Sequence, residues 1–306
     1  MSRDGIRIFN RYTGEYEDER VYGEAFLRLA YGTAVGRWST WAVFSRPFFS
    51  RLFGWRMKQP GTAAKVGPFI EKYGLDADEF AEPPESYRCF NDFFSRELKA
   101  GVRPVDGRAE SVVFPADGRH FGWQKLGLEE GVFVKGQRWD LGPLVGNWVD
   151  QPERFEGGTL VLSRLCPTDY HHFHFPVSGT LLDRTWMGRR LYSVSPFALR
   201  KNLGYLWENK RCLTRIEAGR LGEVLYIEVG ATNVGSIQHH STGEGEKIER
   251  GEPAGWFEFG GSSLVTLFER NKVTLCDDLV ERSREGVELY ARMGDRMGTI
   301  AGAERE

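Results

Sequence analysis

The pattern of hydrophobic and polar positions changes near residue 111. Before this point, residues 66–80 and 86–106 predict short amphipathic helices, the second ending at Arg103-Pro104 because a residue before proline disfavours helical backbone. After it, apolar and polar residues alternate in short runs that turn residues separate, which predicts β-strands. These runs are 111–123, 131–136, 158–165, 172–186, 213–219, 222–237 and 262–270.

One helix is predicted to interrupt the strands, from Ser195 to Lys210, with Ser-Pro at its start. The order of elements predicts an α+β fold. A helical N-terminal region is followed by a compact, largely antiparallel and barrel-sandwich-like β domain.

Residues 21–58 combine Phe, Trp and Leu with six basic residues and a single acid. The apolar stretches 29–36 and 38–45 are far shorter than the ~20 residues that a membrane-spanning helix needs. Arginines among aromatic residues at helical intervals favour amphipathic helices lying on an anionic membrane surface. Two core-packing helices with solvent-facing arginines are the alternative. With the polar tail 1–19, to which no element is assigned, residues 1–58 form the first predicted unit.

Composition narrows the class of protein. The chain has 306 residues, 41% of them hydrophobic, which is too many for a disordered protein. Its net charge of −2 gives no reason to expect a nucleic-acid binder. Four cysteines lie without metal-ligand spacing, and no signal peptide precedes them, so we expect reduced thiols in a cytoplasmic protein.

Three of the six histidines fall in one run, as His171, His172 and His174. In a strand, the second and third share a face and the first points the other way. Clustered histidines are typical metal ligands, with His239 and His240 as further candidates. Because no Cys, Asp or Glu sits at ligand spacing to complete a site, no metal is predicted.

A carboxylate can orient an imidazole that deprotonates a serine, which makes Asp117 a candidate beside the histidine run. The candidate serine is Ser262, which follows Gly260 and Gly261 outside any G-x-S-x-G motif. Its hydroxyl can attack the carbonyl of Gly261, where no side chain is in the way. The resulting ester, after elimination, leaves a pyruvoyl group, an electron acceptor comparable to pyridoxal phosphate.

Five stretches, taken together and in this order, resemble the phosphatidylserine decarboxylases. They are FNDFFSRELKAGVRPVD, FPADG, DYHHFHFPVSG, VGATNVGSI and GEPAGWFEFGGSSLVTLFE. The resemblance implies that Asp117, His174 and Ser262 form the self-processing triad and that the bond between Gly261 and Ser262 is cut. It also implies that His171 assists decarboxylation.

The same resemblance implies a zymogen with a catalytic domain at 59–306. Self-cleavage would divide the whole chain into a β chain (1–261) and an α chain (262–306). The pyruvoyl cofactor would form a Schiff base with phosphatidylserine, and His171 would supply a proton after CO2 leaves, giving phosphatidylethanolamine. We expect a homodimer, peripheral on the cytoplasmic side of the cell membrane. His172 stands where the family commonly has Arg, and Gly-Gly-Ser-Ser replaces the common Leu-Gly-Ser-Thr.

Three alternatives follow from the same residues. One is a pyruvoyl decarboxylase that acts on another amino-acid headgroup. A second is an inactive scaffold of the same fold at a membrane surface. The third is a lipoyl-like carrier, suggested by the strands around 114–118 and 175–181, although neither stretch has the lysine that a carrier needs.

Overall fold

The computed structural model describes residues 6–19, 33, 47–126, 141–231, 237–259 and 262–302. Most of the predicted membrane-surface segment, the strand predicted at 131–136, and Gly260 and Gly261 therefore lie outside the described residues.

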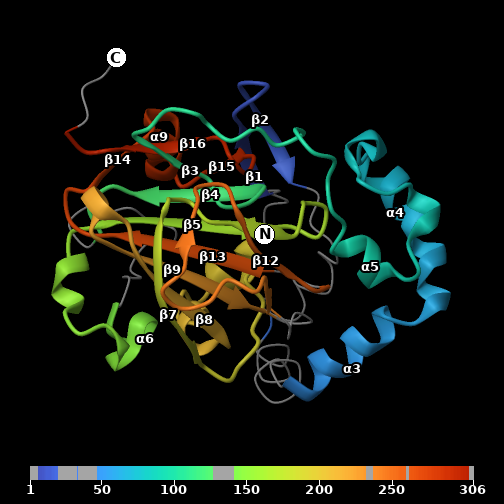
Figure 1. Cartoon of the computed structure of the whole chain (residues 1–306). Helices are drawn as coiled ribbons and strands as arrows, with labels where there is room; N and C mark the ends of the chain where they lie inside the picture. Colours follow the sequence, from blue (N-terminus) through green and yellow to red (C-terminus); the bar gives the residue numbers. More distant parts are fainter. Residues whose placement is uncertain are drawn as a thin grey trace.

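A ten-stranded sheet forms the centre of the molecule, in the order β11-β7-β8-β9-β13-β5-β4-β15-β1-β2 (Figure 1). All neighbouring pairs are antiparallel except β1 and β15. The strands are β1 Ile6–Asn10, β2 Glu15–Glu19, β4 Gly118–Trp123, β5 Thr159–Leu165, β7 Gly179–Met187, β8 Arg211–Glu217, β9 Glu223–Gly230, β11 Lys247–Ile248, β13 Ser262–Phe268 and β15 Glu288–Ala291.

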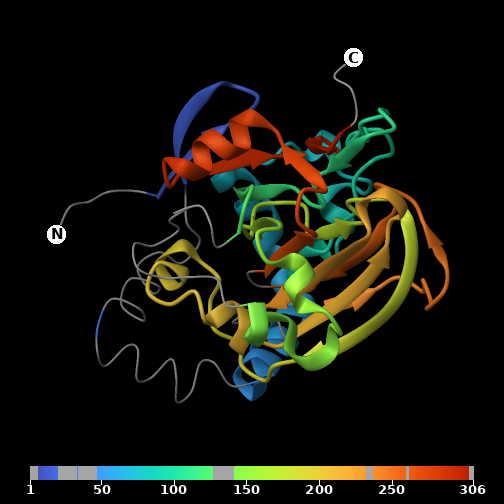
Figure 2. The same ribbon diagram turned by 90° about the vertical axis from the view of Figure 1, so that its left-hand side faces the viewer.

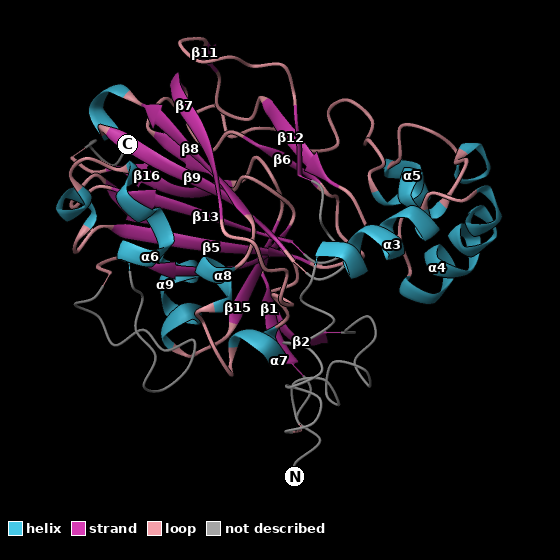
Figure 3. Cartoon of the chain, turned by 90° about the horizontal axis from the view of Figure 1, so that it is seen from below, coloured by secondary structure: helices cyan, strands magenta, loops and turns pink. Residues whose placement is uncertain are grey.

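Two three-stranded sheets complete the β structure, in the orders β10-β12-β6 and β14-β16-β3. Figure 3 shows β6 and β12 between the large sheet and the helices α3 to α5. A hydrophobic core joins them to the large sheet, with Phe173 and Phe257 packed near Tyr226 and Leu264. The strands are β6 His172–His174, β10 Ile237–His239, β12 Pro253–Phe257, β3 Ser111–Val113, β14 Val273–Leu275 and β16 Arg296–Ile300.

Short helices cover the opposite face of the large sheet. Leu144, Leu199 and Leu206 pack there against inward residues of β9 and β13 such as Val265. These helices are α6 Leu141–Val145, α7 Pro196–Leu199 and α8 Tyr205–Glu208, with short 3-10 turns at Gly146–Trp148, Pro152–Phe155 and Gly219–Leu221. The helix α9, Asp277–Arg284, packs against β4 and β15.

The helical region before the strands packs at one side of the sheets (Figure 1). A third core cluster holds it together, and this cluster includes Phe93, Phe94 and, from the distant segment before β13, Phe259. Its elements are α3 Pro47–Met57, α4 Val66–Tyr73 and α5 Phe90–Phe94, with 3-10 turns at Pro60–Lys65, Ala77–Glu79 and Pro84–Ser86.

The predicted α+β class, with helices before a largely antiparallel β domain, is confirmed. Among the described strands the large sheet is open, with β11 and β2 at its edges. No helix in the described ranges is long and apolar enough to span a bilayer.

Two local features differ from the sequence-based expectation. Part of the polar tail forms the hairpin of β1 and β2, which lies beside β15 (Figure 2). The helix predicted from Ser195 to Lys210 is wrong as one element, because α7 and α8 are separate. Between them the Asn202 side chain accepts the Gly204 N–H at 2.9 Å, a local bond that competes with continued helix.

Candidate active site

Ser262 is the first residue of β13, and it lies opposite Leu165 of β5 and Gly230 of β9. Its side chain is fully buried, and its hydroxyl has no hydrogen-bond partner among the described residues. A buried hydroxyl without a partner costs free energy, which is expected at a site that holds a reactive group. The neighbouring Ser263, whose hydroxyl also has no partner, points to the other face of the strand.

The chain just before Ser262 is fixed by the helix α5. The Asn91 side-chain oxygen accepts the Phe259 N–H at 2.9 Å. The ring of Phe259 contacts those of Phe90 and Phe94, with centroids 5.3 and 4.9 Å apart. Burying such a ring contributes about 1.5–3 kcal/mol to the stability of the fold. The residues just before Gly260 and Gly261 are therefore firmly held.

His171 packs against the same helix. Its ring centroid lies 3.8 Å from that of Phe94, and its Nδ1–H donates to the Asp169 carbonyl at 3.0 Å. This bond fixes the tautomer of the neutral ring and leaves the lone pair on Nε2, which has no partner. Burial, reinforced by the positive charge of Arg96, lowers the pKa of His171 to about 3. The imidazole is therefore uncharged at neutral pH.

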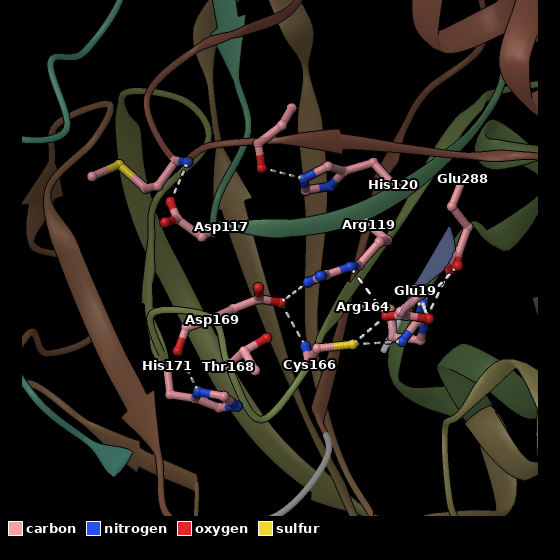
Figure 4. A network of polar contacts seen from close by, with 12 residues as sticks. Glu19, Asp117, Arg119, His120, Arg164, Cys166, Thr168, Asp169, His171 and Glu288 are labelled. Carbon is pink, nitrogen blue, oxygen red and sulfur yellow. Dashed lines mark hydrogen bonds and ion pairs between the residues drawn. The ribbon is translucent and has the colours of Figure 1, made fainter. Parts of the chain in front are cut away.

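Asp169 links His171 to a buried network of charges (Figure 4). Its carboxylate accepts the Cys166 N–H at 2.6 Å and pairs with Arg119. Its backbone carbonyl also accepts a hydrogen bond from Arg96 at 3.2 Å. Burial raises the pKa of Asp169 although Arg119 opposes this shift. The backbone that holds His171 is therefore fixed from two sides.

His174 is almost fully buried on β6. Its Nδ1–H donates to the Gly251 carbonyl at 2.9 Å, and its Nε2 lies 3.4 Å from the Tyr170 hydroxyl. Burial lowers the pKa of His174 to about 4, so the ring is neutral at pH 7. Its Nε2 therefore carries a lone pair that can accept a proton.

Asp117 has other partners than the predicted imidazole. Both carboxylate oxygens accept bonds from Arg103, at 2.9 and 3.0 Å from Nε, and one also accepts the Met293 N–H at 2.9 Å. In the described parts of the chain, no hydrogen bond joins Asp117 to His174 or His174 to Ser262. The charge of Asp117 still acts at a distance, because it partly offsets the lowering of the His174 pKa by burial. Among the described residues, the structure thus does not join the three predicted triad residues by hydrogen bonds.

A cavity of about 410 Å³ borders this region, and Asp117, Asp169 and Tyr170 contribute to its wall. His172, the residue that replaces the common Arg, donates its Nε2–H to the Ser95 carbonyl at 3.0 Å, and its ring stacks on Tyr170. These contacts position the His172 ring.

Four residues at the site were not assigned by sequence reasoning: Asn91, Phe94, Arg96 and Asp169. The first three lie in the stretch FNDFFSRE, which carried the resemblance but gave no hint of its contacts. Several of their partners are distant in the sequence; Arg96 and Asp169, for example, are 73 positions apart. Only the fold brings these groups together.

The geometry defines a class first. A buried serine hydroxyl without a hydrogen-bond partner among the described residues and two neutral imidazoles, His171 and His174, are groups suited to nucleophilic and acid–base chemistry, as in an enzyme.

Comparison with known proteins identifies the family. A sequence model of the family described as phosphatidylserine decarboxylase matches residues 90–299. A protein of Fusobacterium nucleatum named phosphatidylserine decarboxylase proenzyme is 36% identical over 299 residues, covering 97% of this chain and 99% of that protein. Proteins of the same name from Clostridium kluyveri (36%) and Desulfitobacterium hafniense (35%) each align over 96% of this chain and 98% of their own. The chain belongs to the phosphatidylserine decarboxylase family, a family of lyases in phospholipid metabolism.

Proposed function

We propose that this chain is a proenzyme that cuts itself between Gly261 and Ser262 and then decarboxylates phosphatidylserine to phosphatidylethanolamine and CO2. The observation that carries the proposal is the buried Ser262 hydroxyl without a partner at the start of a central strand. The name proenzyme, which the relatives carry, agrees with it.

The strand arrangement favours self-cleavage. β13 is paired on both sides along its length, from Ser262 to Phe268, so the new N-terminus would stay in place after the cut. On the other side of the cut, the bond from Asn91 to Phe259 holds the new C-terminal end. His174 is proposed as the base of this step, because its Nε2 is unprotonated at neutral pH.

Ser262 is proposed to become a pyruvoyl group, and the orphaned hydroxyl and the unpartnered Nε2 of His171 fit such a group. When formed, this carbonyl would condense with the substrate amine and take up the electron pair left by the departing carboxylate. The aromatic wall of Phe94 and Phe259 excludes water, which favours the loss of a charged carboxylate as CO2.

His171 is proposed as the group that moves the proton. Since its Nδ1–H is committed to the Asp169 carbonyl and its ring is neutral, Nε2 must accept a proton before it can donate one. The ammonium group of the substrate, which has to lose a proton before it can react as a nucleophile, is a suitable source. His171 then returns that proton to the carbon from which CO2 has left.

The helix α3 supports the proposal that the protein lies on a membrane surface. Phe48, Leu52 and Trp55, spaced to share one helix face, are exposed by 76%, 52% and 62%. Such an exposed apolar stripe marks a binding surface, and the exposed Arg56 beside it suits an anionic bilayer. The peripheral location at the cytoplasmic face and the homodimer remain parts of this proposal.

The self-processing proposal is tested by the intact mass of the purified protein. We expect two fragments, 1–261 and 262–306, the smaller one with no free amine and with a carbonyl that reacts with hydroxylamine. Ser262→Ala should remain one chain. Ser263→Ala is the matched control, because its side chain points to the other face of β13, and it should be cut. A wild-type protein that stays full length would refute the proposal.

Turnover is tested by release of CO2 from phosphatidylserine vesicles. His171→Ala should be cut normally yet lose decarboxylation, whereas His174→Ala should be cut slowly or not at all.

Membrane binding is tested by sedimentation with anionic vesicles. The double variant Phe48→Ser/Leu52→Ser should bind more weakly than Leu182→Ser, an exposed apolar position on β7. Equal binding of the two would count against α3 as the membrane contact.

A further inference from the structure

The fold brings together three potential metal ligands from three strands: Cys212 of β8, Glu228 of β9 and His239 of β10. Cys212 and Glu228 lie directly opposite each other in the β8–β9 register. His239 belongs to the small sheet that packs over this face, and its ring contacts those of Phe173 and Trp186. One sulfur, one carboxylate oxygen and one imidazole nitrogen lie within 4.8 Å of one another.

The burial of these groups indicates that they serve a bound ligand. Cys212 and Glu228 are completely buried, and the side chain of His239 is only 15% exposed. Two of the facing atoms, Glu228 Oε2 and His239 Nε2, have no hydrogen-bond partner among the described residues. They lie 3.7 Å apart, which is too far for a hydrogen bond but close enough for an ion pair when His239 is protonated. A metal cation between the two atoms would satisfy both of them at once.

The spacing suits tetrahedral coordination. With bonds of about 2.0–2.3 Å to nitrogen, oxygen and sulfur, ligand atoms around a zinc ion lie roughly 3.3–3.6 Å apart. The observed 3.7 Å between Glu228 and His239 is close to this spacing, and the third atom is within 4.8 Å. Small side-chain rotations would close the remaining gap.

We propose that Cys212, Glu228 and His239 bind a divalent transition metal ion of the zinc class, with a fourth position left for water. The donor set of one thiolate, one carboxylate and one imidazole favours zinc over magnesium or calcium, which prefer oxygen ligands alone. The two anionic ligands also offset the nearby positive charge of Arg184. That guanidinium donates to the Thr242 carbonyl at 3.1 Å and to the Thr214 hydroxyl at 3.4 Å, and the same hydroxyl donates to Glu228 Oε1.

The cysteine would bind as a thiolate, and a bound metal ion stabilises that form directly. The metal would tie β10 to the large sheet and so brace the small sheet that carries His172 and His174.

The site lies near the proposed reaction centre but does not depend on it. Glu228 is opposite Leu264 in the β9–β13 register, and Leu264 shares a face with Ser262 two residues earlier. The diagonal separation of such positions in a sheet is about 7–8 Å. Metal binding is expected in cut and uncut protein alike, so it can be tested in Ser262→Ala and stands even if processing fails.

The test uses untagged full-length protein that has been treated with a chelator, dialysed and given one equivalent of Co2+ or Zn2+. We expect one tightly held metal ion per chain, the near-ultraviolet absorption of a cobalt–thiolate bond, the visible bands of tetrahedral cobalt and a raised Tm. Cys212→Ser should lose the thiolate band, and His239→Gln should bind at least tenfold more weakly. The controls Cys276→Ser and His240→Gln should behave as wild type, because neither residue belongs to the proposed ligand set and His240 is exposed, with its ring against that of Trp256.

Three results would overturn the proposal. One is wild-type protein that takes up cobalt without a thiolate band. Another is metal binding that His239→Gln leaves unchanged, since that would indicate adventitious surface binding. The third is loss of metal in His240→Gln alone. If Cys212→Ser does not fold, His239→Gln still gives the answer, because its side chain is partly exposed and its replacement leaves the strand pairing intact.

Discussion

Three buried histidines make the folded protein sensitive to mild acid. Burial lowers the pKa of His120 and His171 to about 3 and that of His174 to about 4, against an ordinary value of 6.5. Below pH 6.5 the unfolded chain takes up a proton at each of them, and the folded chain does not. The stability that these neutral rings contribute is therefore fully present above pH 6.5 and is lost as the pH falls toward their folded pKa values.

The magnitude follows from the size of the shifts. Each group contributes a slope of about 1.4 kcal/mol per pH unit once the pH is well below 6.5, so three contribute about 4. Between pH 7.5 and pH 5 the loss sums to about 6 kcal/mol, a large share of the ~5–15 kcal/mol that stabilises a typical domain. Carboxylates with lowered pKa values, such as Glu19 at about 2, lose their contribution only below their ordinary value of 4.5. Burial also lowers the pKa of His172, which adds to the histidine slope, and raises the pKa of Asp169, which opposes it. The histidines therefore dominate the window from pH 5 to 6.5.

The assay is urea unfolding of Ser262→Ala protein, which stays a single chain if Ser262 is the cleavage site, followed by tryptophan fluorescence across this window. The free energy of unfolding should fall with a slope that corresponds to nearly three protons at the acid end. His171→Asn should reduce that slope by about one proton, whatever it does to the absolute stability. His240→Gln, at an exposed position, should leave it unchanged. A slope of less than one proton, or equal slopes for His171→Asn and its parent, would refute the burial argument.

Three further predictions concern the groups around the site. Asn91→Ala should lower the free energy of unfolding by about 1–3 kcal/mol, because it removes the side-chain acceptor of the buried Phe259 N–H, and it should slow cleavage; cleavage at the parent rate would contradict the anchoring role. Phe94→Ala should cost about 3–5 kcal/mol and admit water beside His171, seen as a rise in its pKa by NMR in Ser262→Ala protein. Arg103→Ala should cost about 3–5 kcal/mol by removing the ion-pair partner of the buried Asp117, whereas Arg88→Ala, at an exposed pair, should leave the free energy of unfolding nearly unchanged.

The fold was predictable wherever local pattern and burial agree. β13 could be recognised because its residues alternate between two buried layers, with Leu264 in one and Val265 in the other. The hairpin at 6–19 could not, because only Ile6 and Ile8 mark its inner face and its pairing with β15 joins opposite ends of the chain. That pairing is completed by buried charge, as Glu19 binds Arg164 at 2.8 Å. From its composition alone, such a segment is interpreted as a polar tail without secondary structure.

The candidate site was predictable as a set of residue types but not as a set of contacts. The sequence motifs point to His171, His174 and Ser262, and the structure buries all three. It does not follow from any motif that Asp117 pairs with Arg103, because that contact depends on how residues 95–106 cross the end of β4. For the proposed metal site, His239 could be suggested from the sequence but its partners could not, because strand register pairs Cys212 with Glu228 and the packing of a second sheet brings His239 to them.

The placement of Asp117 suggests how the helical front and the site are joined. Arg103 bridges Asp117, at 2.7 Å, and Glu79, at 2.9 Å, so one guanidinium ties the region of α4 to the strand that begins at Gly118. A second tie runs from Asn91 of α5 to Phe259, next to the proposed cleavage site. Both contacts are largely shielded from water, where charged and neutral hydrogen bonds hold their geometry. The helix α3 packs in the same cluster as Phe259. Its exposed face is therefore also fixed relative to Ser262. If α3 binds the bilayer, the depth of that contact sets how far a lipid headgroup must rise to reach the site.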